Sequence, residues 1–376
     1  MPSSGGAARG PVIVHVFAKT DVGRTREHNE DAFVVADLTT DDASLLPTVR
    51  THEAGERGSL FMVADGMGGA AAGEIASEMA TAIVLRELRR DWLAHADPTA
   101  DAFAAALRRA AVVANAEINA FAAHHPEYRG MGTTATIAGL LGDTLYLAQV
   151  GDSRAYLVRD GVARQITKDQ SLMQKLVEAG ELTEEEAERS ERRNIILQAL
   201  GPEATVKIDL THQKLRRDDV LVLCSDGLSG QVSRDQIAEV IRDQPDLVAA
   251  CKQLIDLANS AGGPDNITVI AVRFDGEGLS APAHSDEVRH RVYPLADSGN
   301  TPSRGVDRLL DDQSGHATTP VHAVTRETVP VRAAEEQPLV TEERRARGRM
   351  MQRLLLGALV IAVVAAAAWW LGKARN

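Results

Sequence analysis

The clearest pattern along residues 12–275 is a series of short apolar runs bounded by glycine, aspartate or asparagine. Runs of this kind, rich in Val, Ile, Leu, Thr and Tyr, predict β-strands. We expect strands at Val12–Ala18, Ala32–Ala36, Ser59–Ala64, Thr133–Leu140, Thr144–Val150, Ala155–Val158, Val220–Cys224 and Thr268–Phe274. Helical patterns cover Glu74–Asp91, Thr99–Ala123, Ser171–Glu178, Arg234–Arg242 and Asp246–Ser260. Strands in groups and helices in pairs favour antiparallel sheets with helices packed outside them over a doubly wound parallel sheet.

Residues 276–353 have a different composition. They contain six of the 14 prolines and one aromatic residue, Tyr293. The apolar surface is too small to offset the entropy of ordering the chain. We therefore predict a flexible linker over 276–353.

The segment Leu354–Leu371 is apolar and carries no charge over 18 residues. As a helix it would be about 27 Å long, close to the ~30 Å hydrocarbon core of a bilayer. Arginines precede it at positions 344, 345, 347, 349 and 353. The positive-inside rule then predicts a single-pass anchor at 354–372 in the inner (plasma) membrane, with all preceding residues in the cytoplasm. The alternative is a buried C-terminal helix.

The chain has 53 acidic and 41 basic residues, a net charge of −12. This balance argues against a general nucleic-acid-binding protein and is compatible with cation binding. The two cysteines, Cys224 and Cys251, form no C-x-x-C pair, so neither a disulfide framework nor a zinc ribbon is expected. Residues 1–11 lack the apolar core of a secretory signal.

Five short motifs place an aspartate beside a predicted strand. They are Asn29-Glu30-Asp31, Asp65-Gly66-Met67-Gly68-Gly69, Gly151-Asp152-Ser153-Arg154, Ser225-Asp226-Gly227 and Gly263-Pro264-Asp265-Asn266. A single Asp-Gly after a strand is usually only a turn. If the five converge, their carboxylates need a cation to remain ionised together. Oxygen ligands favour Mg²⁺ or Mn²⁺, and two such ions could hold a hydroxide for in-line attack on phosphorus.

The stretch Gly66–Ala71 also matches the G-x-G-x-x-A fingerprint of dinucleotide-binding proteins. The acidic residue about 20 positions later would be Glu87, which lies inside a predicted helix instead of at the end of a second strand. The dinucleotide reading is therefore disfavoured. The chain contains no G-x-x-x-x-G-K-[ST] motif, which excludes a P-loop hydrolase.

The ensemble of motifs resembles the bacterial metal-dependent protein phosphatases of the 2C type (PPM family). The motifs occur in the family's order over residues 12–275, and they include Thr20-Asp21-Val22-Gly23-Arg24, Gly132-Thr133-Thr134 and Asp265-Asn266-Ile267-Thr268 beside those above. The resemblance implies an α+β fold, an αββα sandwich of two antiparallel sheets flanked by helices. It places the metal site at one end of the sandwich.

The resemblance also implies roles for individual residues. Asp65 matches the carboxylate that bridges two metal ions, and Gly66 a backbone-carbonyl ligand. Asp226 and Asp265 match ligands of the second ion, and Asp152 a ligand of a possible third.

Two acidic residues and one arginine complete the implied site. Glu30 and Asp31 match residues that hold metal-bound waters. Arg26 matches the arginine that binds the substrate phosphate, for which a planar guanidinium is suited.

Two departures from the family pattern affect catalysis and substrate choice. Some relatives have a histidine after the Asp-Gly that can act as general acid, and here that residue is Met67. His28 is a nearby candidate only by its position in the sequence. Residues Gln165–Gly201 resemble the family's mobile flap, with Gln170 at a position where histidine is common.

The leading hypothesis is a membrane-tethered phosphatase that hydrolyses phosphoserine and phosphothreonine in proteins at a binuclear Mn²⁺ or Mg²⁺ site. We expect a monomer that reverses a cognate bacterial Ser/Thr kinase and binds no nucleic acid. One alternative is an inactive relative that only senses or scaffolds. Another is an enzyme of the same fold dedicated to one small regulatory phosphoprotein.

Overall fold

The computed structural model describes residues 10–43, 48–68, 72–190, 192–281, 287–295 and 324–325. The strands in these ranges form two main antiparallel sheets. The first sheet has the order β3 (Arg50–Ala54), β1 (Val12–Asp21), β13 (Ile267–Asp275), β12 (Val220–Cys224), β8 (Arg154–Arg159), β9 (Val162–Gln165). The second has the order β11 (Asp209–Lys214), β7 (Thr144–Val150), β6 (Ala135–Leu141), β4 (Ser59–Met67), β2 (Asp31–Asp37). Two short pairs complete the strands: β5 (Gly132–Thr133) joins β4, and β10 (Ile195–Ile196) joins β14 (Val324–Thr325).

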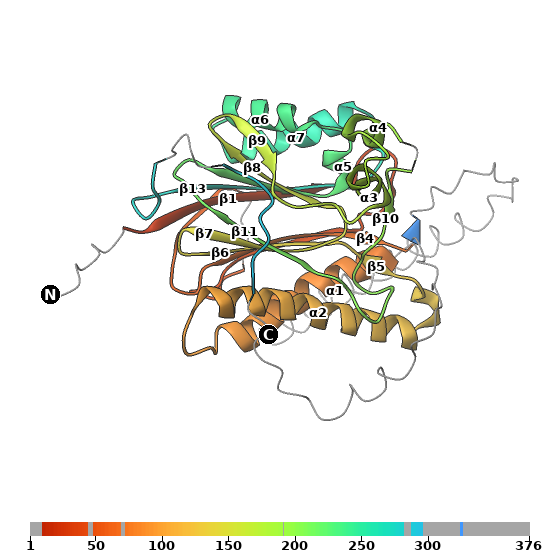
Figure 1. The fold of residues 1–376 in the computed structure, drawn as a ribbon, viewed down its shortest axis with the longest axis horizontal. Coiled ribbons are helices and arrows are strands. Elements are labelled where there is room, and N and C mark those ends of the chain that lie inside the picture. Colours follow the sequence, from red (N-terminus) through yellow and green to blue (C-terminus); the bar gives the residue numbers. More distant parts are fainter. Residues whose placement is uncertain are drawn as a thin grey trace, which may run out of the picture. The chain divides into compact units, whose positions relative to one another are not determined.

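Helices cover the outer face of each sheet (Figure 1). On the second sheet lie α1 (Ala72–Glu87), a π-helical turn η1 (Leu88–Trp92) and α2 (Ala100–His124), followed by the 3₁₀ turn η2 (Pro126–Tyr128). On the first sheet lie α5 (Asp226–Ser229), α6 (Arg234–Asp243) and α7 (Leu247–Ser260). Two short helices, α3 (Leu172–Glu178) and α4 (Glu184–Glu188), belong to the flap segment Gln165–Gly201.

Three apolar layers hold the sandwich together. The middle layer, between the two sheets, includes Phe61, Leu157 and Phe274, which are fully buried. A second layer lies between the second sheet and α1 and α2, and a third between the first sheet and α6 and α7. All nine residues of β4 are buried, because the strand has a sheet on one side and a helix on the other. The αββα sandwich implied by the resemblance is confirmed.

All eight predicted strands are present, and the predicted helix 74–91 is divided between α1 and η1. Local capping explains where several helices begin. The Thr99 side chain accepts a hydrogen bond from Ala102 N at the start of α2, and Ser233 forms a capping box with Gln236 at the start of α6.

The segment 287–295, which we call the strap, lies along the outer edge of β11. Its backbone continues the sheet: His212 N donates to Arg291 O at 2.9 Å, and Tyr293 N donates to Leu210 O at 2.8 Å. The strap therefore covers an edge strand that would otherwise expose unpaired backbone groups.

Side chains add to the contacts beyond residue 275. His290 Nε2 lies 2.6 Å from Asp209 Oδ2, and Tyr293 OH donates to Asp101 Oδ1 at 2.5 Å. Leu279 is only 1% exposed. The expectation of a flexible linker starting at 276 differs from the structure here, because residues 276–281 and the strap pack on the sandwich.

No helix within the described ranges is long and apolar enough to cross a membrane. The predicted anchor 354–372 lies outside these ranges, as does most of the predicted linker.

Candidate active site

The end of β4 brings Asp65 next to a second buried carboxylate. Asp65 is 4% exposed and stands opposite Asp31 of β2 in the antiparallel register. Its backbone N donates to Thr134 Oγ1 at 2.9 Å, and its carbonyl accepts from Thr134 N at 2.9 Å. The next residue, Gly66, donates to Glu30 O at 3.0 Å. A Cβ on Gly66 would lie 2.2 Å from the Gly73 carbonyl oxygen, so only glycine fits this close approach.

Asp31 links the β2 side of the site to the first sheet. Its Oδ2 accepts hydrogen bonds from Ser225 Oγ and Thr268 Oγ1, both at 2.7 Å. Burial raises the pKa of Asp31 to about 7, although the two hydroxyl groups lower it, and the negative charges of Asp226 and Asp265 raise it further. The structure thus gathers Asp31, Asp226 and Asp265 close enough for their charges to repel, which a bound cation would relieve.

The side chain of Asn266 ties the loop before β13 to the loop between β1 and β2 at this end of the sandwich. Its Nδ2 donates to Val22 O and to His28 O, both at 2.9 Å, and its Oδ1 accepts from Glu30 N at 2.8 Å. In the sequence Asn266 stands within a motif, but its residue type alone predicts no role for it. The feature of the sequence that could have indicated this role is the position of Asn266 directly after Asp265 and just before a predicted strand.

Arg26 forms an ion pair with Asp265. Nη2 donates to Oδ2 and Nε lies near Oδ1, each at 3.0 Å, with the two side chains 38% and 19% exposed. A predicted phosphate-binding group therefore contacts a predicted metal ligand. Either a phosphate on Arg26 or a cation at Asp265 would compete with this pair.

Asp152 lies in the turn between β7 and β8 and is 6% exposed. Its neighbour Ser153 places Oγ 2.7 Å from Thr134 Oγ1, the same hydroxyl that accepts from Asp65 N. The Asp152 turn is thereby connected to β4 through one buried hydroxyl pair.

These contacts bring together five motifs that are far apart in the chain. A family model for protein phosphatase 2C matches residues 34–267. The chain belongs to this family.

Curated relatives of this protein phosphatase 2C come from several bacteria. The chain is 37% identical over 263 residues to the serine/threonine phosphatase stp of Listeria monocytogenes, covering 70% of this chain and 96% of the relative. It is 39% identical over 334 residues to the serine/threonine protein phosphatase PstP of Mycobacterium tuberculosis, covering 80% of this chain and 58% of the relative.

Solved structures give the same family. The crystal structure of the M. tuberculosis phosphatase PstP/Ppp has a TM-score of 0.59 and 37% identity, over 70% of this chain and 99% of that one. The PstP catalytic domain in complex with two manganese ions has a TM-score of 0.57 and 37% identity, with the same coverage.

The donor set fits small hard cations. In the described part of the chain, no three His, Cys, Asp or Glu side chains form a ready-made metal cluster. Mg²⁺ typically keeps several waters and takes only one or two carboxylates, so such a cluster is not required. The buried Oδ1 of Asp31 has no hydrogen-bond partner in the structure, which leaves an acceptor for a water ligand.

The two departures from the family pattern have structural counterparts. Met67 is 5% exposed and packs with Ile196 and Ala199 of the flap segment, so it serves as an apolar contact. His28 is exposed, and its backbone oxygen accepts a hydrogen bond from Asn266 Nδ2. Gln170 accepts from Gly151 N at 3.0 Å and donates to Lys207 O at 3.1 Å, which makes it a connector beside the Asp152 turn.

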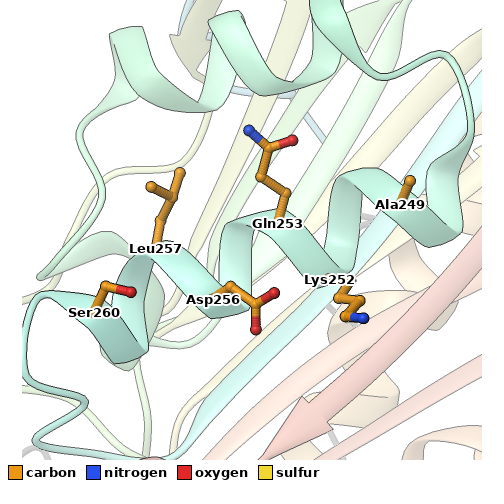
Figure 2. Close-up of a pocket in the computed structure, with 6 residues that line it drawn as sticks. All are labelled: Ala249, Lys252, Gln253, Asp256, Leu257 and Ser260. Carbon is orange, nitrogen blue, oxygen red and sulfur yellow. The ribbon is translucent and has the colours of Figure 1, made fainter.

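A shallow pocket on the outer side of α7 lies away from these residues. Its lining side chains all come from this one helix and include Lys252 and Asp256 (Figure 2). It contains none of the predicted site residues.

Proposed function

We propose that this protein phosphatase 2C hydrolyses phosphoserine and phosphothreonine in proteins with two divalent cations, Mn²⁺ or Mg²⁺. Family membership makes it a metal-dependent protein serine/threonine phosphatase. The observation that carries the proposal is the convergence of Asp31, Asp65, Asp226 and Asp265 at one end of the sandwich.

Different residues of the chain would bind the different ions. Asp65 would hold both ions and the Gly66 carbonyl would be a further ligand, while Asp226 and Asp265 would hold the second ion and Asp152 a possible third. When bound, the cations supply a nucleophilic water at neutral pH and neutralise charge on the phosphate.

Three further side chains would orient water and substrate. Asp31, fixed by Ser225 and Thr268, and the neighbouring Glu30 would orient the waters around the ions. Arg26 would leave Asp265 and bind two phosphate oxygens through its guanidinium fork, which aligns the phosphorus for attack.

The decisive experiment is turnover of a phosphothreonine peptide by the purified chain in Mn²⁺. We expect hydrolysis that chelation abolishes and that added Mn²⁺ restores. Undiminished turnover in excess chelator would refute the metal-dependent mechanism, and absence of turnover in Mn²⁺ and Mg²⁺ would favour the inactive-relative alternative.

We also propose that residues 354–372 anchor the chain in the inner membrane, with the catalytic domain in the cytoplasm and opposing a Ser/Thr kinase. The support is the 18-residue uncharged run and the arginines before it. A tether of the residues from 326 to 353, beyond the β10–β14 pair, has an r.m.s. reach of about 30 Å, estimated as ~5–6 Å × √n. Recovery of the full-length chain in the soluble fraction without detergent would refute the anchor.

A further inference from the structure

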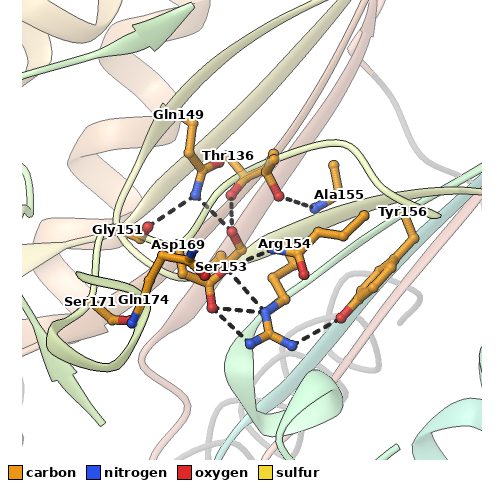
Figure 3. Close-up of polar contacts among 12 residues, drawn as sticks. Thr136, Gln149, Gly151, Ser153, Arg154, Ala155, Tyr156, Asp169, Ser171 and Gln174 are labelled. Atoms are coloured by element: carbon orange, nitrogen blue, oxygen red, sulfur yellow. Dashed lines mark hydrogen bonds and ion pairs between the residues drawn. The ribbon is translucent and has the colours of Figure 1, made fainter. Parts of the chain in front are cut away.

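A partly buried ion pair lies beside the turn that contains Gly151 and Ser153 (Figure 3). Arg154, the first residue of β8, donates from Nη2 to Asp169 Oδ2 at 2.7 Å and from Nε to both Asp169 oxygens at 3.0 and 3.1 Å. Its third nitrogen, Nη1, donates to Tyr156 OH at 3.1 Å. The guanidinium is thus held on two sides, and the pair is bidentate, the strongest geometry for this chemistry.

Asp169 sits at the root of the flap segment. It precedes Gln170 and Ser171, and Ser171 is the N-cap of α3, the first flap helix. Asp169 Oδ1 also accepts from Gln165 Nε2 at 2.8 Å, at the end of β9. The Asp169 carboxylate therefore lies between the end of β9 and the start of α3, the first helix of the flap.

The turn that carries Asp152 is fixed to the second sheet. Ser153 O accepts from Thr136 Oγ1 at 2.9 Å and from Gln149 Nε2 at 2.8 Å. Gly151 has a φ of +95°, and a Cβ there would lie 2.7 Å from Thr134 Cγ2. Because these hydrogen bonds hold the turn on the second sheet, we expect that a change at the ion pair would move the root of the flap and not the turn.

Beside the ion pair, two hydrogen bonds that involve the backbone of Gly151 join the turn to the root of the flap. Gln170 N donates to Gly151 O at 2.9 Å, and Gly151 N donates to Gln170 Oε1 at 3.0 Å. Both are short contacts between a loop and a turn, so their geometry depends on what holds Asp169 in place.

We propose that Arg154 and Asp169 are a positioning pair that fixes the root of the flap against the Asp152 turn. Breaking the pair should make the flap more mobile while the sandwich stays folded. It should also loosen the hydrogen bonds between the flap root and the Asp152 turn and so raise the Mn²⁺ concentration that the site needs for activity. The inference rests on the proposed function only for this second, catalytic consequence.

The same strand provides a matched control. At the other end of β8, Arg159 donates from Nη2 to Asp219 Oδ2 at 2.6 Å and from Nε to Asp219 Oδ1 at 2.8 Å. That pair is 6% and 0% exposed, compared with 26% and 10% for Arg154 and Asp169. Asp219→Asn therefore breaks a more deeply buried pair made by the other end of β8, without touching the flap.

The test is limited trypsin digestion of the full-length chain under native conditions, with flap cleavage after Arg192 and Arg193 followed by mass spectrometry. We expect Asp169→Asn to speed flap cleavage by about tenfold or more, the equivalent of one lost charge-assisted hydrogen bond. Asp219→Asn should leave the flap rate close to that of the original chain.

Arg154→Lys is the second variant, for use if Asp169→Asn does not fold. Lysine keeps the positive charge but cannot make the bidentate hydrogen bonds of the guanidinium group. Circular dichroism identifies folded variants, and we expect flap cleavage about threefold faster in the lysine variant. Equal flap rates in the original chain and in every folded Arg154 or Asp169 variant would overturn the proposal, as would an equal acceleration by Asp219→Asn.

The second readout is the Mn²⁺ concentration that gives half-maximal turnover of a phosphothreonine peptide. We expect it to rise severalfold in Asp169→Asn and to stay unchanged in Asp219→Asn. An inactive original chain would count against the proposed function, while the protease result would still decide the role of the pair.

Discussion

Replacing Arg26 by alanine should change substrate binding and cation binding in opposite directions. In the structure the Arg26 guanidinium makes two contacts of 3.0 Å with Asp265. Under the proposed mechanism the same guanidinium binds the phosphate, and Asp265 binds a cation. The substitution removes the phosphate contact and, at the same time, releases a carboxylate for the cation.

The expected magnitudes follow from the exposure of the pair. With Arg26 at 38% and Asp265 at 19% exposed, the ion pair resembles a surface pair, worth about 0.2–1 kcal/mol. A bidentate phosphate contact is worth about 1.5–3 kcal/mol. Subtracting the pair that must first be broken leaves about 1–2 kcal/mol, or roughly a 5- to 30-fold rise in KM.

The assay is steady-state hydrolysis of a phosphothreonine peptide at saturating Mn²⁺, followed by a Mn²⁺ titration at fixed peptide. We expect a higher KM with little change in kcat, and a half-saturating Mn²⁺ concentration that falls by up to about fivefold.

The matched control is Arg24→Ala, an exposed arginine on the same loop whose backbone N donates to Gly263 O. It should leave both quantities unchanged. If Arg26→Ala also left KM and the Mn²⁺ dependence unchanged, neither the phosphate role nor the competition at Asp265 would hold.

Three further changes test other parts of the structure. Asp65→Ala should lower kcat by at least about 10³-fold while the circular dichroism spectrum stays native, because it removes the carboxylate proposed to hold both ions; residual activity above a tenth would contradict its role. A chain ending at residue 281 should melt several degrees below one ending at 295, because it loses the strap's backbone hydrogen bonds and the His290–Asp209 pair; equal melting temperatures would mean that the strap adds nothing. Gly151→Ala should cost about 1–3 kcal/mol in the free energy of unfolding, because of its φ of +95° and the 2.7 Å approach to Thr134; an unchanged denaturation midpoint would contradict the strain argument.

Sequence patterns identified the buried strands well and missed the polar edges. The strands β3, with sequence Arg-Thr-His-Glu-Ala, and β11, with sequence Asp-Leu-Thr-His-Gln-Lys, were not predicted. Both lie at a sheet edge, where strand formation depends on backbone pairing with a neighbour and not on two apolar faces. The strap was missed for the same reason, since its contacts come mainly from backbone groups.

The site shows a similar division. The resemblance to the 2C-type phosphatases implied that the carboxylates meet at one end of the sandwich, and the register of Asp31 with Asp65 agrees with it. The ion pairs of Arg26 with Asp265 and of Arg154 with Asp169 were not predictable, because each depends on the tertiary approach of two separate segments of the chain. The apolar role of Met67 likewise appears only once Ile196 and Ala199 are placed beside it.

The pairing of β1 with β13 sets the order in which a growing chain can complete this domain. The register joins Thr20 to Thr268 and Asp21 to Ile267, so the first strand waits for the last one. At synthesis rates of about 5–20 residues per second, roughly 12–50 s separate the two on the ribosome. During this interval β1 can pair only with β3, and the loops that carry Arg26 and Asp265 cannot meet. The catalytic end of the sandwich is therefore assembled in the final step of folding, and a nascent chain released early would have a nearly complete second sheet but no active site.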